Sequence, residues 1–318
     1  MQTESSHAPN GHAPHEIEGI VPIIPTPFQP ESEEVDFGAL RGLVEFAAGR
    51  DLAAICLPAY ASEFYKLSEA ERLRVTETAI QTARGRIPVI AQSNHPSARV
   101  AADIARRNAD LGADLISFAI PRQFALTDED LFAYCLTITR AVRVPVLIQD
   151  FNPGGPTISA AFCARLCQAS PNLRYVKLEE ALMGPKIAAI REATHDQVGV
   201  LIGWGGMYLM ELLAEGICGV MPGLSKSDIL ARVWRLARAG QQDAALDIFQ
   251  SILPLIVLGL QNLELLHILE KRLLVARGVL AQATVRRPRY TPSPHVLQYA
   301  DQLNRRVIAL LATLDPAG

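Results

Sequence analysis

The stretch "LRYVKLEEALMGPK", Leu173–Lys186, contains a lysine inside an otherwise apolar, strand-like run. Lys177 interrupts that run, and Glu179 and Glu180 follow almost at once. Charged side chains are seldom buried in a strand unless they have a partner there. Two interpretations are therefore open: a surface lysine on an edge strand, or an amine held in a pocket to carry out chemistry.

The alternation of side chains along a strand gives this run two unlike faces. A period of two places Tyr175, Lys177 and Glu179 on one face and Val176 and Leu178 on the other. The all-apolar face suits packing against helices, so we expect the face with Lys177 to point into the mouth of a barrel. A lysine held there is poorly hydrated, which disfavours its ammonium form.

Similar apolar runs of strand length recur along the chain, at a spacing of roughly 20 to 35 residues. Each is apolar almost throughout, as parallel strands covered on both faces must be. The runs begin at Gly19, Ala53, Ile87, Ala113, Val144, Leu173, Val198 and Gly216.

Amphipathic helical patterns lie between these runs. One opens at Asp36, a residue type that favours the N-cap position. Another starts at Ser68 and ends at Gly85, with Ser68 and Glu71 spaced as a capping box. Strand-then-helix units repeated in this way predict a parallel sheet.

Eight such units without a break in composition predict the α/β class, as a (β/α)8 TIM barrel with additional C-terminal helices. A doubly wound sheet is the rival, but the first strand leads into "PTPFQPE" and lacks a glycine-rich phosphate loop. We expect a disordered tail over residues 1–18 and the barrel over 19–225. Residues 226–318 are expected to form the last barrel helix and a helical extension of the same unit.

The composition excludes several classes of function. The 318 residues are 49% hydrophobic and 20% charged, with a formal net charge of −3. This balance gives no support to a nucleic-acid or anionic-membrane surface. The N-terminus lacks the pattern of a signal peptide, and the five cysteines lack metal-ligand spacing, so we expect buried thiols and a cytoplasmic protein. We interpret the apolar stretch from Ser251 to Leu280 as buried helices.

Polar residues follow several of the predicted strands, at the end of a barrel where chemistry takes place. Lys177 could form a Schiff base with a carbonyl substrate or a structural ion pair, and Glu179 could transfer protons or be its ion-pair partner. The adjacent Glu180 is expected to face the loop or solvent. The candidates at strand ends are Glu63, Asn94, His95, Arg122, Gln123, Gln149, Asp150, Asn152, Lys177, Glu179, Glu180 and Trp204.

Two of these candidates have structural alternatives. Glu63 could fix its own loop by accepting hydrogen bonds from backbone amides. Arg122 could bind a substrate carboxylate or pair with Asp128 or Glu129. The sequence contains no pattern that indicates a metal site, and we predict no cofactor.

The ordered motifs "PTPF", "VDFGALRGLVEF", "SEFYKLSEAER", "GADLISFAIP", "VPVLIQDFNP", "YVKLEE" and "GVMPG" extend over about residues 19 to 290. In these motifs and in their order, the chain resembles the dihydrodipicolinate synthase/N-acetylneuraminate lyase family, whose members are class I aldolases that act through a Schiff base. The resemblance implies a TIM barrel with C-terminal helices, commonly a homotetramer. It also implies an imine between a 2-oxo acid and the strand-six lysine, here Lys177.

The chain resembles a divergent member of this family, because several of the family motifs are altered in it. The family loop G-T-T-G-E, which holds the carboxylate of the keto acid, corresponds to Ala59, Tyr60, Ala61, Ser62 and Glu63, so only the glutamate is retained. In the family, a tyrosine near the end of strand five relays protons. Its position is occupied here by Gln149 or, if the alignment is shifted by one residue, by Asp150. The Tyr-Tyr pair after strand four is replaced by "PRQF", and "NPGGPTI" lacks the arginine often found after strand five.

We therefore predict a lyase, of aldolase or dehydratase type, that acts on a small-molecule 2-oxo acid through a Schiff base on Lys177. Catalysis is assigned to Lys177, Glu179 and Gln149 or Asp150. Two alternatives stay open: a non-catalytic ligand-binding or regulatory protein, and an enzyme that acts on a carboxylate substrate without an imine. A homo-oligomer, tetramer or dimer, is expected. The predicted substrate-binding residues are Tyr60, Ala61, Ser62, Glu63, Asn94, Arg122 and Trp204.

Overall fold

The computed structural model describes residues 17–123, 125–152 and 155–314. Most of the predicted N-terminal tail, residues 1–16, lies outside these ranges. Its predicted end at residue 18 is wrong, because Ile17 is only 2% exposed and packs among the side chains inside the barrel. The backbone N–H of Ile17 donates a hydrogen bond to the Tyr175 hydroxyl at 2.9 Å, so the ordered fold includes this residue.

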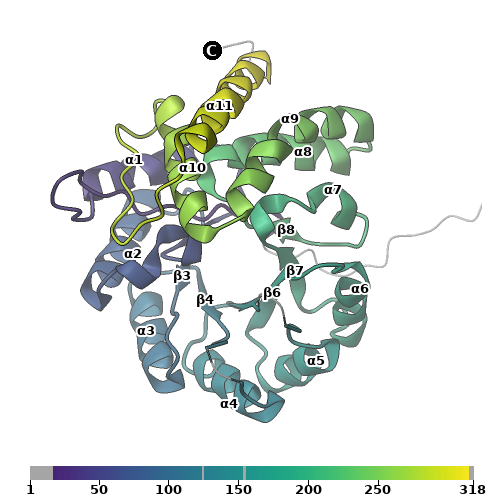
Figure 1. Ribbon diagram of the computed structural model, residues 1–318. Coiled ribbons are helices and arrows are strands. Elements are labelled where there is room, and N and C mark those ends of the chain that lie inside the picture. Colours follow the sequence, from purple (N-terminus) through teal and green to yellow (C-terminus); the bar gives the residue numbers. More distant parts are fainter. Residues whose placement is uncertain (1–16, 124, 153–154, 315–318) are drawn as a thin grey trace, which may run out of the picture.

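Eight parallel strands curl into a closed barrel, as predicted (Figure 1). Each strand pairs with its neighbours in chain order, and the bridge between Ile23 and Cys56 joins the first strand to the second. The strands are β1 Gly19–Ile20, β2 Ile55–Leu57, β3 Val89–Gln92, β4 Leu115–Ala119, β5 Val146–Phe151, β6 Leu173–Glu179, β7 Gly199–Ile202 and β8 Gly219–Val220.

Helices surround the barrel, and the predicted caps are confirmed. The Asp36 carboxylate accepts a hydrogen bond from the Ala39 N–H at 2.9 Å, and Ser68 and Glu71 form the capping box. The helices are α1 Phe37–Ala48, α2 Glu69–Ala83, α3 Ala98–Asp110, α4 Asp128–Thr139, α5 Ala160–Ala169, α6 Gly184–Ala193, α7 Leu209–Leu212, α8 Ser227–Arg238, α9 Gln242–Leu260, α10 Leu263–Ala276 and α11 Pro294–Leu314.

Strand β6 has the two faces that its sequence predicts. Tyr175 packs inside the barrel, whereas Val176 and Leu178 belong to the cluster between the sheet and the helices. Lys177 lies opposite Gln149 of β5 in the parallel register and is 5% exposed. The strand therefore carries its lysine toward the barrel interior, and the interpretation as an exposed edge strand is excluded.

The first strand is much shorter than the apolar run beginning at Gly19 suggests. Pro22, Pro25 and Pro27 have no backbone N–H and cannot donate to a neighbouring strand. The regular strand therefore ends at Ile20, and the chain continues beside β2 and β8 through the backbone N–H groups of Val21, Ile23 and Ile24.

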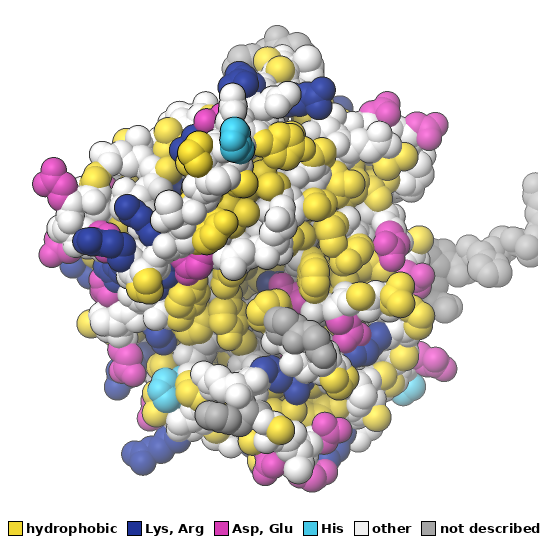
Figure 2. Space-filling view, viewed as in Figure 1, with side chains coloured by type: hydrophobic (Ala, Val, Ile, Leu, Met, Phe, Trp, Pro, Cys, Tyr) yellow, Lys and Arg dark blue, Asp and Glu magenta, His cyan; other side chains and the backbone are white. Residues whose placement is uncertain are grey.

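The C-terminal helices cover one side of the barrel mouth. Helix α9 packs against α8, α10 and α11 although it contains Pro254. By length and composition it is the one described helix that is long and apolar enough to cross a membrane, and 44% of its most apolar 18-residue window is buried within the protein. On this face, hydrophobic side chains gather across α9 and α10 toward the barrel centre (Figure 2).

Candidate active site

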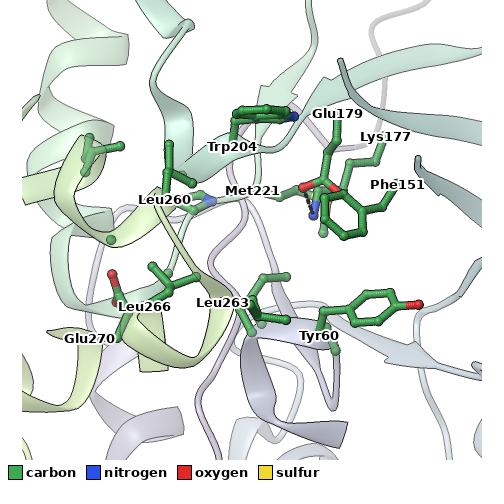
Figure 3. Close-up of a pocket in the computed structure, with 18 of the residues that line it drawn as sticks. Tyr60, Phe151, Lys177, Glu179, Trp204, Met221, Leu260, Leu263, Leu266 and Glu270 are labelled. Carbon is green, nitrogen blue, oxygen red and sulfur yellow. Dashed lines mark ion pairs between the residues drawn. The ribbon is translucent and has the colours of Figure 1, made fainter. Parts of the chain in front are cut away.

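A cavity of about 250 Å³ opens where the carboxyl ends of the barrel strands meet α9 and α10. It is smaller than the roughly 300–1,000 Å³ clefts that hold drug-sized ligands, so it suits a small metabolite. Strands β5 and β6 and the segments that follow β7 and β8 supply one side, and the ends of α9 and α10 supply an apolar wall (Figure 3). The lining residues are Ile23, Ala59, Tyr60, Ala61, Gln149, Phe151, Lys177, Glu179, Trp204, Gly205, Met221, Pro222, Gly223, Lys226, Ile256, Gly259, Leu260, Leu263, Leu266 and Glu270.

Lys177, Glu179 and Gln149 form the polar centre of this cavity. The Lys177 Nζ lies 3.1 Å from Glu179 Oε1, and the side chains are 6% and 11% exposed. The Gln149 amide donates to Glu179 Oε2 at 2.8 Å, which fixes the carboxylate beside the amine. The Gln149 Oε1 is buried and lacks a hydrogen-bond partner among the described residues. A nucleophile and a proton-transfer group are thus within contact distance in one pocket.

Glycine at position 203 is required for this arrangement. Gly203 follows β7, and its backbone N–H donates to the Leu178 carbonyl of β6. A Cβ at this position would lie only 1.9 Å from Glu179 Oε1. The absent side chain therefore provides the space that the Glu179 carboxylate occupies.

Aromatic side chains frame the charged centre on both sides (Figure 3). The Tyr60 ring lies 5.8 Å from the Phe151 ring, between their centroids. Burial and the negative charge of Glu179 raise the pKa of Tyr60, so its hydroxyl keeps its proton at neutral pH. Trp204 also lines the cavity, and its buried Nε1–H has no acceptor among the described residues. Both side chains are placed to contact a ligand.

Asp150 and Arg122 are not part of the cavity lining. Asp150 lies on the opposite face of β5 from Gln149, so the cavity-facing residue at the expected relay position is Gln149. The Asp150 carboxylate accepts two hydrogen bonds from Arg122 and one from the Ile158 N–H. Arg122 therefore pairs with Asp150, which corrects the alternative that it pairs with Asp128 or Glu129.

Glu63 points away from the cavity into a buried polar network. It has a left-handed backbone conformation with φ of 59°, and its carboxylate accepts from Lys271 at 2.6 Å and Lys66 at 3.1 Å. Burial lowers the pKa of Lys271 to about 8. The neighbouring Ser62 hydroxyl donates to the Ile24 carbonyl. These contacts tie the loop that presents Tyr60 to the C-terminal part of the chain.

The remaining strand-end candidates also make local contacts outside the cavity. The Asn94 Oδ1 accepts a hydrogen bond from the Ala119 N–H at 2.6 Å and so joins β3 to β4. Glu180 faces the loops, as expected, and pairs with Lys186 at 2.6 Å and with the Thr157 hydroxyl. Of the residues predicted to bind substrate, the structure brings Tyr60, Ala61 and Trp204 to the cavity.

A second buried ion pair lies in the cavity wall and was not predicted from the sequence. The Lys226 Nζ contacts Glu270 Oε1, and both side chains are at most 5% exposed. The other carboxylate oxygen of Glu270 accepts from the Ser225 N–H at 3.0 Å. The sequence signal is the polar run "SKSD" directly after the eighth strand, where the sequence predicts only the start of the last barrel helix.

The residues that the structure describes do not provide a set of ligands for a metal ion. Within those residues, no group of three or more histidine, cysteine, aspartate and glutamate side chains could hold a metal ion. The five cysteines are free and buried, and burial raises the pKa of the Cys56 thiol to about 11. The polar chemistry of the cavity therefore rests on lysine, glutamate, glutamine and tyrosine side chains.

A parallel barrel with an interior lysine beside a carboxylate is an arrangement that suits a lyase forming an imine with its substrate. Comparison with known proteins makes this assignment specific. A family model described as "Dihydrodipicolinate synthetase family" matches residues 16–305, and the chain belongs to this family. It is therefore a Schiff-base lyase, and a non-catalytic binding protein is not favoured.

Individual relatives extend the comparison. The chain is 27% identical to L-2-keto-3-deoxyarabonate dehydratase of Azospirillum brasilense over 304 residues, which cover 94% of each protein. It is 31% identical to 4-hydroxy-tetrahydrodipicolinate synthase of Sorangium cellulosum over 164 residues, or 51% of this chain and 54% of the relative. The crystal structure of dihydrodipicolinate synthase from Rhodopseudomonas palustris superposes with a TM-score of 0.84 at 26% identity, covering 92% of this chain and 99% of that one.

Proposed function

We propose that the chain dehydrates a 2-keto-3-deoxy sugar acid through an imine on Lys177. The observation that carries this proposal is the Lys177 amine held 3.1 Å from the Glu179 carboxylate inside the cavity. The similarity to L-2-keto-3-deoxyarabonate dehydratase over 94% of both chains supports the choice of substrate class.

Lys177 starts the reaction as a nucleophile. Its free amine adds to the C2 carbonyl of the 2-oxo acid, and one water leaves as the imine forms. The protonated imine makes a C3 proton acidic, and its removal gives an enamine. The enamine expels the hydroxyl on C4, which takes up a proton and leaves as a second water. Hydrolysis of the imine consumes one water and returns the amine, so the net change is the loss of one water.

Glu179 is the group that we assign to both proton transfers. Its carboxylate takes the proton from C3 and returns it to the departing hydroxyl on C4. A single carboxylate can do this because the first step leaves it protonated for the second. Gln149 cannot exchange a proton at neutral pH, so its contact with Glu179 assigns it an orienting role.

The remaining cavity residues hold the substrate in this proposal. Tyr60, Ala61 and Trp204 bind the end of the 2-oxo acid near the imine, where a phenol and an indole N–H are available as donors. Ser62 and Glu63 act indirectly, because they fix the loop that presents Tyr60. Asn94, Asp150 and Arg122 stabilise the neighbouring strand ends through their own contacts.

Turnover of a synthetic panel tests this function. We expect one or more 2-keto-3-deoxy pentonates or hexonates to lose one water, detected by mass spectrometry. Lys177→Met should abolish the reaction, whereas Lys186→Met, which changes a lysine outside the cavity, should leave it intact. No loss of water from any member of the panel with the folded wild type, or an unchanged rate in Lys177→Met, would contradict the proposal.

The assembly and location of the protein are further parts of the proposal. Members of this family are typically oligomeric, and we propose a homo-oligomer, dimer or tetramer. Leu126 and Leu182 are 46% and 86% exposed in the described part of the chain and could be covered in such an assembly. The free cysteines fit a reducing compartment such as the cytoplasm. Light scattering after size-exclusion chromatography measures the assembly directly.

A further inference from the structure

The ion pair of Lys226 and Glu270 lies in the same cavity as Lys177 but on a different side. Glu270 comes from α10, whereas Lys226 follows β8 in the turn before α8. Figure 3 places Glu270 across the cavity from Lys177 and Glu179, with the leucine side chains of the α9–α10 corner between them. The cavity therefore has two charged ends separated by an apolar wall.

An apolar wall does not need a buried ion pair for stability. Replacing such a pair by well-packed apolar side chains is often neutral or stabilising, because both charges lose their hydration. Room for the carboxylate also depends on Gly223, where a Cβ would lie 2.3 Å from Glu270. The pair thus occupies space that the backbone leaves open for it, on a surface that a ligand can reach.

The hydrogen-bonding capacity of the pair is not exhausted by the protein. The Lys226 ammonium has three N–H donors, and the structure gives it two acceptors, Glu270 Oε1 and the Ser225 hydroxyl. Each oxygen of Glu270 accepts one hydrogen bond, from Lys226 or from the Ser225 N–H, and can accept another. A donor and an acceptor therefore remain side by side at the cavity wall.

We propose that Lys226 and Glu270 bind a hydroxyl at the distal end of the 2-oxo acid and so select a hydroxylated chain. This inference rests on the proposed function, because it assumes that the 2-oxo end reacts at Lys177. A hydroxyl can accept from Lys226 and donate to Glu270 at once. A second carboxylate could use only the lysine and would face the negative charge of Glu270, so a dicarboxylate is disfavoured.

Borohydride trapping of two matched acids tests the selection without requiring turnover. 4,5-Dihydroxy-2-oxopentanoate and 4-hydroxy-2-oxopentanoate differ only in the terminal hydroxyl. The concentration dependence of trapping on Lys177 gives an apparent dissociation constant for each. We expect the wild type to favour the dihydroxy acid by about ten- to a hundredfold, the range for a hydrogen bond to a charged group.

Two double variants separate selection from structure. Lys226→Met/Glu270→Met should bring the ratio of the two constants close to one. Lys186→Met/Glu180→Met removes a comparable pair outside the cavity and should keep the wild-type ratio. If the first double variant does not fold, Lys226→Met/Glu270→Gln provides a second pair of neutral side chains for the same measurement.

The outcomes distinguish this inference from the function on which it rests. Pyruvate has no distal hydroxyl, so its trapping on Lys177 should be unchanged in both double variants. Trapping of pyruvate together with equal constants for the two acids in the wild type would overturn the inference alone. A wild-type ratio in both double variants would overturn it in the same way. Failure to trap any of the three acids on Lys177 would overturn the proposed function as well.

Discussion

Replacement of Glu179 by glutamine changes the proposed proton carrier while keeping its size. In the wild type its carboxylate contacts Lys177 at 3.1 Å and accepts from Gln149 at 2.8 Å. A glutamine can occupy the same space but cannot take the proton from C3 or return it to the leaving hydroxyl. We therefore expect Glu179→Gln to lower kcat by about 10² to 10⁴, which corresponds to roughly 3 to 5 kcal/mol in activation free energy.

Formation of the imine should respond differently. The nucleophile of this step is the Lys177 amine, and a glutamine at position 179 keeps a side chain of the same size beside it. Borohydride trapping of pyruvate by Glu179→Gln should therefore proceed at a rate close to that of the wild type. The split between intact trapping and lost turnover is specific to a proton carrier, because a misfolded pocket would lose both.

Glu180→Gln is the matched control, since Glu180 is the next residue and pairs with Lys186 outside the cavity. Stopped-flow turnover and trapping are measured on both variants, together with their thermal unfolding midpoints. If Glu179→Gln keeps kcat within about fivefold of the wild type, Glu179 is not the proton carrier. Equal losses in the two variants would also refute the assignment.

Three further predictions follow from the same contacts. Gly203→Ala should lower kcat nearly as much as Glu179→Gln, because its Cβ would lie 1.9 Å from the Glu179 carboxylate; wild-type kinetics would contradict this. Lys271→Met should lower the free energy of unfolding in urea by about 3 kcal/mol, because it removes the nearer of the two lysines that pair with the buried Glu63 carboxylate; a change near zero would contradict it. Burial lowers the pKa of His267 from 6.5 to about 3. Between pH 6.5 and about pH 3, the unfolded chain binds a proton on this histidine that the folded chain does not bind. The free energy of unfolding therefore falls as the pH falls through this range. Between pH 7 and 4.5 the wild type should lose about 3 kcal/mol relative to His267→Gln, and parallel pH curves for the two would contradict this.

The fold could be predicted because its signals are local. Alternation along β6 placed Tyr175 and Lys177 inside and Val176 outside, and the structure has this arrangement. The caps at Asp36 and Ser68 depend only on residues three positions away. The short β1 differs from expectation because prolines remove donors from an otherwise strand-like run.

The site was harder to predict because its contacts are distant in sequence or sensitive to register. A shift of one residue along β5 exchanges Gln149 and Asp150 between the two faces, and the sequence left both possibilities open. The Glu63 carboxylate accepts a hydrogen bond from Lys271, which is 208 residues away in the sequence. The direction of the Glu63 side chain therefore could not be predicted from the sequence of its own loop. Lys226 and Glu270 are 44 residues apart, and only the folded chain brings them into one cavity.

Borohydride trapping with pyruvate tests the proposed chemistry most directly, because it asks whether Lys177 forms an imine. Intact-mass measurement followed by peptide mapping should show one pyruvate-derived adduct for each chain, on Lys177. Lys177→Met should show no adduct, while Lys186→Met should be modified like the wild type. An adduct on another lysine, its persistence in Lys177→Met, or no adduct on the folded wild type would contradict the central claim.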